Sequence, residues 1–334
     1  MQMKQYQLDV AVTRGDEIES EHRVHAAVVG EADQLLGAAG DSNAFTYWRS
    51  CAKPFQVIPF LSSGGFDALG WEDEQLAVSC ASHGGEPEHV TIVEQMLRDI
   101  GLEEGDLACG PHEPSSQRGA RILRDNGGRT SRLHNNCSGK HAAMLAMARH
   151  KGWPTEGYER REHNVQRTIL HEVSLWADVP CGRISQAVDG CGVVVFGMTL
   201  ERMARAYSRF AIAADRGEEY PMRVLNAMGS NPFLVGGTDR IDSAIISETK
   251  GRVISKVGAE GVHCALLTER GIGVAIKVHD GAQRAQYPAL LRLLQELDAL
   301  PDPLPPKLDE WMHKPVKNTR GETVGEITMR VDVA

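Results

Sequence analysis

Two side chains near residue 50 could form a hydrolytic pair. Ser50 and Lys53 lie in the segment 49–54, which has the sequence RSCAKP. If a helix begins here, these residues share one face, so a neutral Lys53 amine could accept the Ser50 proton. A serine needs such a base, and a lysine serves as one only when burial or a nearby cation such as Arg49 lowers its pKa. A simple capped helix start has the same pattern.

A second serine and a second lysine could repeat this arrangement. Ser82 lies in the segment 80–89, where one helix is expected to end and another to begin with Pro87 in its first turn. It could be a second active hydroxyl, or Ser82 and His83 could be turn and cap residues. Lys256 ends a β-prone run before two glycines and could point into a cleft, although an isolated lysine is more often solvated.

Two further segments place thiols among polar residues. Cys137 and Lys140 are three residues apart at the start of a predicted helix, so a thiol and an amine could converge on a ligand or a metal. Cys191 is flanked by glycines, which allow a ligand close to the backbone, and Asp189 could orient that ligand or bind a substrate amine. The alternative is that both cysteines are buried core thiols and that Asp189 belongs to a plain turn.

The composition excludes several classes of protein. The 334 residues carry a formal net charge of −9 without long runs of one sign, which argues against nucleic-acid binding. No apolar stretch approaches the roughly 20 residues that span a bilayer, and the N-terminus lacks a signal-peptide pattern, so we expect a cytoplasmic protein. Seven cysteines form an odd set in a chain too long to need disulfides, so a disulfide framework is not expected.

The elements that must position these residues follow a simple order. β-prone runs occupy both ends of the chain, and helical periodicity dominates the middle. The predicted strands are residues 6–14, 18–29, 252–257, 263–267, 272–278 and, at an edge, 323–331. The predicted helices are residues 87–100, 138–150, 161–176, 200–214, 218–228 and 285–300. We therefore predict an α+β fold in which the terminal strands form one antiparallel sheet beside a central helical lobe.

Taken together, the motifs resemble those of the thermolabile, Rhizobium-type L-asparaginases, whose fold is similar to that of serine β-lactamases and penicillin-binding proteins. The matching runs lie in the family's order at residues 49–54, 81–87, 135–141, 189–192 and 256–261. The match extends through nearly the whole chain. The resemblance implies that residues 1–334 form a single two-lobed amidohydrolase domain of β-lactamase-like fold.

The resemblance also implies roles for the residues named above. It implies two Ser-Lys dyads, Ser50 with Lys53 and Ser82 with Lys256, where Lys277 is the competitor for the second lysine.

A zinc ion is implied as well, held by Cys137, Lys140 and Cys191. A lysine ligand is unusual because it must be neutral to coordinate. Asp189 would lie beside the metal or on the substrate amine. Arg49 is the expected partner of the substrate carboxylate, and His141 could bind the substrate together with Arg49 and Asp189.

The activity implied is the conversion of L-asparagine and water to L-aspartate and ammonia, by a protein expected to be a homodimer. An alternative of the same class is the hydrolysis of another amide, such as glutamine, a β-aspartyl peptide or a lactam. An alternative of a different class is a non-catalytic metal or redox sensor that uses Cys137 and Cys191.

Overall fold

The computed structural model describes residues 3–330 and divides the chain into two compact units. We call the first the sheet unit; it comprises Met1–Cys51, Met198–Ile212 and Ser255–Ala334. The second, the helical unit, comprises Ala52–Gly197 and Ala213–Ile254. Each unit is described by itself below. The expectation of a single domain over residues 1–334 stays a prediction.

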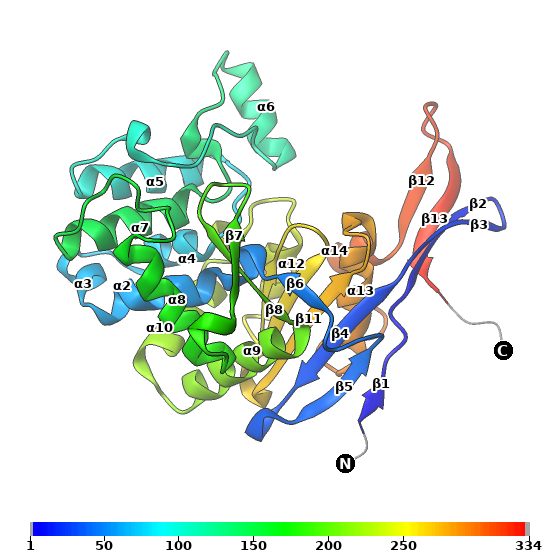
Figure 1. The fold of residues 1–334 in the computed structure, drawn as a ribbon. Helices are drawn as coiled ribbons and strands as arrows, with labels where there is room; N and C mark the ends of the chain where they lie inside the picture. The colour runs from blue at the N-terminus through cyan, green and yellow to red at the C-terminus, as the bar shows by residue number, and fades with distance from the viewer. Residues whose placement is uncertain (1–2, 331–334) are drawn as a thin grey trace. The chain divides into compact units, whose positions relative to one another are not determined.

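A six-stranded sheet forms the core of the sheet unit (Figure 1). Apart from the polar, exposed edge strand β1, its strands are mostly apolar and buried, which suits a sheet covered on both faces. The pairs β5–β4, β4–β11 and β11–β10 are antiparallel, and the β1–β5 pair at the edge is parallel. The order is β1 (Lys4–Gln5), β5 (Leu35–Ala39), β4 (Val24–Val29), β11 (Ile272–Val278), β10 (Val262–Leu267) and β9 (Val253–Val257). Strands from both ends of the chain share this sheet, as predicted.

Two helices cover opposite faces of this sheet. On one face, Gly273 of β11 lets α9 (Leu200–Asp215) approach, because an added Cβ would lie 2.1 Å from the Ala204 carbonyl oxygen. On the other face, His263 of β10 packs edge-on against Tyr287 of α13 (Gln283–Glu296). His263 is directly opposite Ile276, three residues from Gly273 and therefore on the other side of the pleat.

A second sheet in the sheet unit has the order β12 (Lys314–Lys317), β13 (Thr323–Met329), β2 (Val10–Arg14) and β3 (Glu17–His22). In Figure 1 the red β12–β13 hairpin lies beside the blue β2–β3 hairpin. A turn with Gly15 at φ +57° joins β2 to β3, which pair antiparallel. The sheet unit also holds β6 (Phe45–Tyr47) and α14 (Pro306–Met312).

Two strand predictions were wrong in detail. The run 18–29 is not one strand: it divides at Arg23 into β3 and β4, which belong to different sheets. The last strand is not at an edge, because β12 pairs with its outer side. Lys314–Lys317 is short, polar and contains a proline, so its sequence gave no strand signal. Residue 331 of the predicted strand lies outside the described residues.

The helical unit is built around α4 (Asp73–Cys80), which packs against α5 (Pro87–Asp99), α7 (Ser138–His150) and α10 (Glu219–Ser230). Gly139 of α7 permits a close approach, because an added Cβ would lie 2.4 Å from the Val78 carbonyl oxygen. The remaining elements are α1 (Lys53–Gln56), α2 (Ile58–Ser62), α3 (Gly65–Ala68), α6 (Gln117–Asp125), α8 (Asn164–Ala177), α11 (Pro232–Val235), α12 (Ile241–Glu248), β7 (Ser185–Val188) and β8 (Val194–Thr199).

The fold class predicted from the sequence, α+β, is confirmed, but the terminal strands form two sheets and not the one antiparallel sheet that was predicted. All seven cysteines are free thiols. Among residues 3–330, no helix combines the length and the apolar character needed to cross a membrane.

Candidate active site

Ser50 lies in a short, strained turn. It belongs to the 3₁₀ helix η2 (Arg49–Ala52), and Arg49 adopts φ +52°, a left-handed conformation that is costly for a non-glycine residue. The Ser50–Lys53 pairing was conditional on a helix beginning here, and the structure has no continuous helix: η2, α1 and α2 are separate short pieces, with Pro54 and Pro59 near the starts of the last two. Such strain is typical of functional turns.

The sheet unit places this turn beside the strand end that carries Lys256. The Cys51 thiol donates a hydrogen bond to the Lys256 carbonyl oxygen at 3.0 Å. Gly258 is required nearby, because an added Cβ would lie 3.0 Å from the Cys51 sulfur and 3.4 Å from Cβ of Arg49. The segments that contain Ser50 and Lys256 are therefore neighbours within one unit.

Lys256 has the burial expected of a site lysine. Its side chain is 0% exposed, and its amine donates to the Val257 carbonyl oxygen at 2.9 Å. Lysine is rarely fully buried, because removing an ammonium group from water is costly. Lys277 is only partly buried and donates to the Glu260 carbonyl oxygen at 2.7 Å. The burial favours Lys256 over Lys277 as the second dyad lysine, which stays a prediction.

The helical unit joins Lys53 to Ser82. Lys53 is 1% exposed, and its amine lies 3.2 Å from the Ser82 hydroxyl and 3.3 Å from the Asn136 carbonyl oxygen. It also donates to the Ala81 carbonyl oxygen. A lysine amine acts as a base only in its neutral form, in which it can accept the proton of a neighbouring hydroxyl. The sequence reasoning paired Ser82 with Lys256 alone and missed this contact.

The loop after Ser82 is clamped by a buried carboxylate that the sequence reasoning did not single out. Glu86 is 0% exposed and accepts hydrogen bonds from the Thr238 backbone N–H and hydroxyl, both at 2.7 Å, and from Arg118 at 2.6 Å. Burial acts to raise the pKa of Glu86, but the bonds from Thr238 and Arg118 outweigh it and hold that pKa below its usual range.

His83, the neighbour of Ser82, has a structural role. Its ring is fully buried, stacks on His89 with centroids 4.9 Å apart, and hydrogen-bonds the Ser138 hydroxyl at 2.9 Å. Burial, reinforced by the neighbouring His89 and Lys53, holds the pKa of His83 well below its usual value, so the ring is neutral.

The thiol segments also converge within the helical unit. The Lys140 amine lies 3.1 Å from the Cys191 sulfur, and an Asp189 carboxylate oxygen lies 3.7 Å from the same sulfur. A hydrogen bond from Cys137, together with the charge of Lys140, lowers the pKa of Cys191 to about 5 despite burial. Burial acts to lower the pKa of Lys140, but the charges of Cys191, Cys137 and Asp189 outweigh it and raise that pKa.

This cluster fits the donor set expected for zinc in residue type. Two thiols and one amine are buried together, and zinc binds sulfur and nitrogen donors in tetrahedral sites. Over residues 3–330, no three or more His, Cys, Asp and Glu side chains form a group able to hold a metal ion. A zinc site at Cys137 and Cys191 would therefore need Lys140 in its neutral form as the third ligand.

His141 offers one unused ring nitrogen. Its Nδ1 lies 2.6 Å from the Tyr158 hydroxyl, and within the described residues its buried Nε2 has no hydrogen-bond partner. Burial, with a smaller contribution from Lys140, lowers the pKa of His141 to about 3, so the ring is neutral. A buried polar atom without a partner is rare and is explained when a ligand or water supplies the bond.

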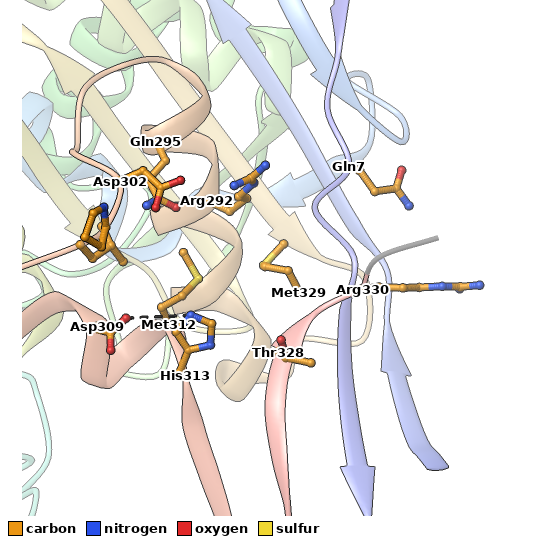
Figure 2. A pocket seen from close by; sticks show the side chains of 12 residues that line it. Gln7, Arg292, Gln295, Asp302, Asp309, Met312, His313, Thr328, Met329 and Arg330 are labelled. Carbon is orange, nitrogen blue, oxygen red and sulfur yellow. Dashed lines mark ion pairs between the residues drawn. The ribbon is translucent and has the colours of Figure 1, made fainter. Parts of the chain in front are cut away.

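A groove elsewhere in the sheet unit contains none of these residues. A cavity of about 560 Å³ is lined by residues of α13, α14 and β13, among them Arg292, Met312 and Met329, whose side chains are drawn in Figure 2. None of the serine and lysine residues of the predicted site lines this cavity, so its volume is no evidence for that site.

Fold and site together define an α+β protein with a buried serine–lysine contact. The sequence model of a family described as L-asparaginase II matches residues 10–329. The chain therefore belongs to the L-asparaginase II family. None of the curated proteins compared with it matches the sequence.

Solved structures give only distant likenesses. The structure of Mglu in its native form is 16% identical with a TM-score of 0.47; the match covers 83% of this chain and 65% of that one. A β-lactamase from Mycobacterium bovis is 12% identical with a TM-score of 0.40, over 83% and 96% of the two chains. A Bacillus glutaminase is 14% identical with a TM-score of 0.37, over 83% and 91%. The chain thus spans less than two thirds of the length of Mglu.

Proposed function

We propose that this protein is an L-asparaginase that hydrolyses L-asparagine to L-aspartate and ammonia. The observation that carries the proposal is the family match, which extends over residues 10–329. The buried contact between Lys53 and Ser82 supports it, because a hydroxyl and an amine at 3.2 Å can exchange a proton.

In the proposed reaction, the Ser50 oxygen attacks the side-chain amide carbon while the Lys53 amine takes the hydroxyl proton. A carbon–oxygen bond forms, the carbon–nitrogen bond breaks, and the proton leaves with the ammonia. Water then hydrolyses the acyl ester, releases L-aspartate and restores the Ser50 hydroxyl. Ser82 and Lys256 assist by moving protons, and the hydrogen bond between Ser82 and Lys53 supports this role for Ser82.

Binding of the substrate is assigned to charged and polar groups. Arg49 is proposed for the substrate carboxylate and Asp189 for its amine. His141 is proposed as a further contact, supported by its unpartnered Nε2. Backbone N–H groups near the Ser50 turn would stabilise the oxyanion.

Cys137, Lys140 and Cys191 are the residues proposed to hold zinc. When bound, the ion would supply a Lewis acid or fix the geometry of the substrate. The homodimer and the cytoplasmic location stay predictions.

The test is hydrolysis of a panel of amides by the protein: ammonia release from L-asparagine and L-glutamine, release of the amino acid from a β-aspartyl peptide, and ring opening of a lactam probe. We expect L-asparagine to give the highest kcat/KM. Preference for another amide would replace the proposed substrate within the same class. No reaction with any of the four would contradict the proposal and favour the metal or redox sensor.

A further inference from the structure

Arg240 places an unpaired positive charge next to Ser82. One of its guanidinium nitrogens donates to the Ser82 carbonyl oxygen at 3.4 Å. Within residues 3–330 this is its one hydrogen bond through the side chain, and no carboxylate lies within ion-pair distance of it. A guanidinium carries five donors and stays charged at all physiological pH values, so most of the binding capacity of Arg240 is unused.

The protein holds this arginine in place with a costly loop. Gly236 and Gly237 precede it, and an added Cβ at Gly236 would lie 2.9 Å from Cβ of Arg240. At Gly237, with φ +130°, an added Cβ would lie 2.6 Å from a carboxylate oxygen of Glu86 and 3.4 Å from Cγ of Arg240. Only glycine fits both positions, so the stem of Arg240 is packed against the backbone.

Glu86 ties that loop to the loop of Ser82. Its carboxylate accepts two hydrogen bonds from Thr238, two residues before Arg240, while the Ser82 N–H donates to the Val235 carbonyl oxygen at 3.1 Å. Hydrogen bonds therefore join the two loops within the helical unit. Arg240 is held at a fixed place relative to the Ser82 hydroxyl and its Lys53 partner.

We propose that Arg240 binds the α-carboxylate of the amide substrate and that Glu86 positions it. This inference rests on the proposed asparaginase activity. In L-asparagine, three carbon–carbon bonds of about 1.5 Å separate the carboxylate carbon from the amide carbon, so a cation beside Ser82, which moves protons at the amide in the proposed reaction, can reach the carboxylate. A guanidinium matches a carboxylate with two parallel hydrogen bonds. Arg240 would act in addition to Arg49, since a carboxylate accepts several donors.

The test compares two substrates in three variants. The substrates are L-asparagine and its α-carboxamide, which keeps the side-chain amide but lacks the carboxylate charge. The variants are Arg240→Met, Arg240→Lys and the control Arg98→Met, which removes an exposed arginine of the same unit whose side chain pairs, among residues 3–330, with Glu94 and Gln95 only. We expect Arg240→Met to lose roughly 10- to 100-fold in kcat/KM for L-asparagine, mainly through KM, and to keep its activity on the α-carboxamide.

The kcat/KM of Arg240→Lys for L-asparagine should lie between the values of the parent and of Arg240→Met, because lysine keeps the charge and loses the paired hydrogen bonds. An unchanged KM in Arg240→Met would overturn the inference. An equal loss on both substrates would also overturn it, because it would show a structural role only.

A second readout separates this inference from the proposed function. Stabilisation by L-aspartate, measured as a shift in Tm at one fixed ligand concentration, should be equal in the parent and in Arg98→Met and clearly smaller in Arg240→Met. If the parent hydrolyses none of the amides, the proposed function fails, but this pattern would still support Arg240 as a carboxylate site. A parent that L-aspartate does not stabilise, or an Arg240→Met variant that it stabilises as much as the parent, would overturn the inference.

Discussion

The buried group of Cys137, Lys140 and Cys191 can hold either a proton or a metal ion. The proton on the Lys140 amine competes with zinc for that nitrogen. The ammonium–thiolate pair of Lys140 and Cys191 satisfies both residues at 3.1 Å without an ion. Zinc would take the place of the Lys140 proton, and two thiols supply much of its affinity. Replacing Cys137 removes a proposed zinc ligand but leaves the Lys140–Cys191 pair in place. This substitution therefore distinguishes a site that binds zinc from one that holds only the ion pair.

We predict that protein purified without added zinc contains close to one zinc per chain and that Cys137→Ala loses most of it. Elemental analysis measures both. Cys264→Ala is the matched control, because Cys264 is equally buried but belongs to the sheet unit. Equal zinc contents in the parent and in Cys137→Ala would contradict the assignment of the ligands.

At the scale of elements, the hydrogen bonds that join the Ser82 loop to the Thr238 loop depend on the ionised carboxylate of Glu86. We call this set of bonds the clamp. Glu86 has a pKa below its ordinary value of 4.5, so its charge contributes stability that is fully present above pH 4.5. As the pH falls through the lower pKa of the folded state, Glu86 is protonated and this contribution is lost.

We predict that Glu86→Gln lowers the free energy of unfolding by about 1.5 to 3 kcal/mol at pH 7, because charged hydrogen bonds from Thr238 and Arg118 are weakened. The difference from the parent should shrink as the pH falls below 4.5. Urea denaturation at several pH values measures it.

Glu88→Gln is the matched control, since Glu88 binds the same Arg118 but is exposed. A surface pair contributes at most about 1 kcal/mol, so this variant should stay close to the parent. Equal losses in the two variants, or a loss in Glu86→Gln that does not change with pH, would contradict the clamp.

The sequence predicted the elements better than the contacts between them. Helices such as α5 were predicted to within one residue of their observed bounds, because their apolar residues repeat with the helical period. The run 18–29 was read as one strand because both halves are β-prone, and the change of sheet at Arg23 has no local signature. β12 was missed because a polar strand with a proline resembles a loop.

At the scale of the whole molecule, the predicted site draws on segments that are far apart in the sequence. The density of polar residues around Ser82 and Cys137 could be seen in the sequence. The contact of Lys53 with Ser82 could not, because it depends on how α1 and the loop after α4 pack. The sequence around Arg240 did not indicate a functional residue, since an arginine that follows two glycines is typical of a surface loop. The family match, by contrast, extends over residues 10–329.

The same serine and lysine residues decide whether the whole chain acts as the proposed enzyme. Ser50 is the proposed nucleophile, and Ser82 is the proposed proton carrier beside Lys53. Loss of a nucleophile removes nearly all activity, whereas loss of a group that assists proton transfer costs roughly 10²- to 10⁴-fold.

The most direct measurement is ammonia release from L-asparagine by the parent, Ser50→Ala and Ser82→Ala, with circular dichroism to confirm that each variant is folded. We predict activity in the parent, none detectable in Ser50→Ala, and a loss of at least about 100-fold in kcat for Ser82→Ala. Equal activity in all three folded proteins would contradict the serine–lysine mechanism.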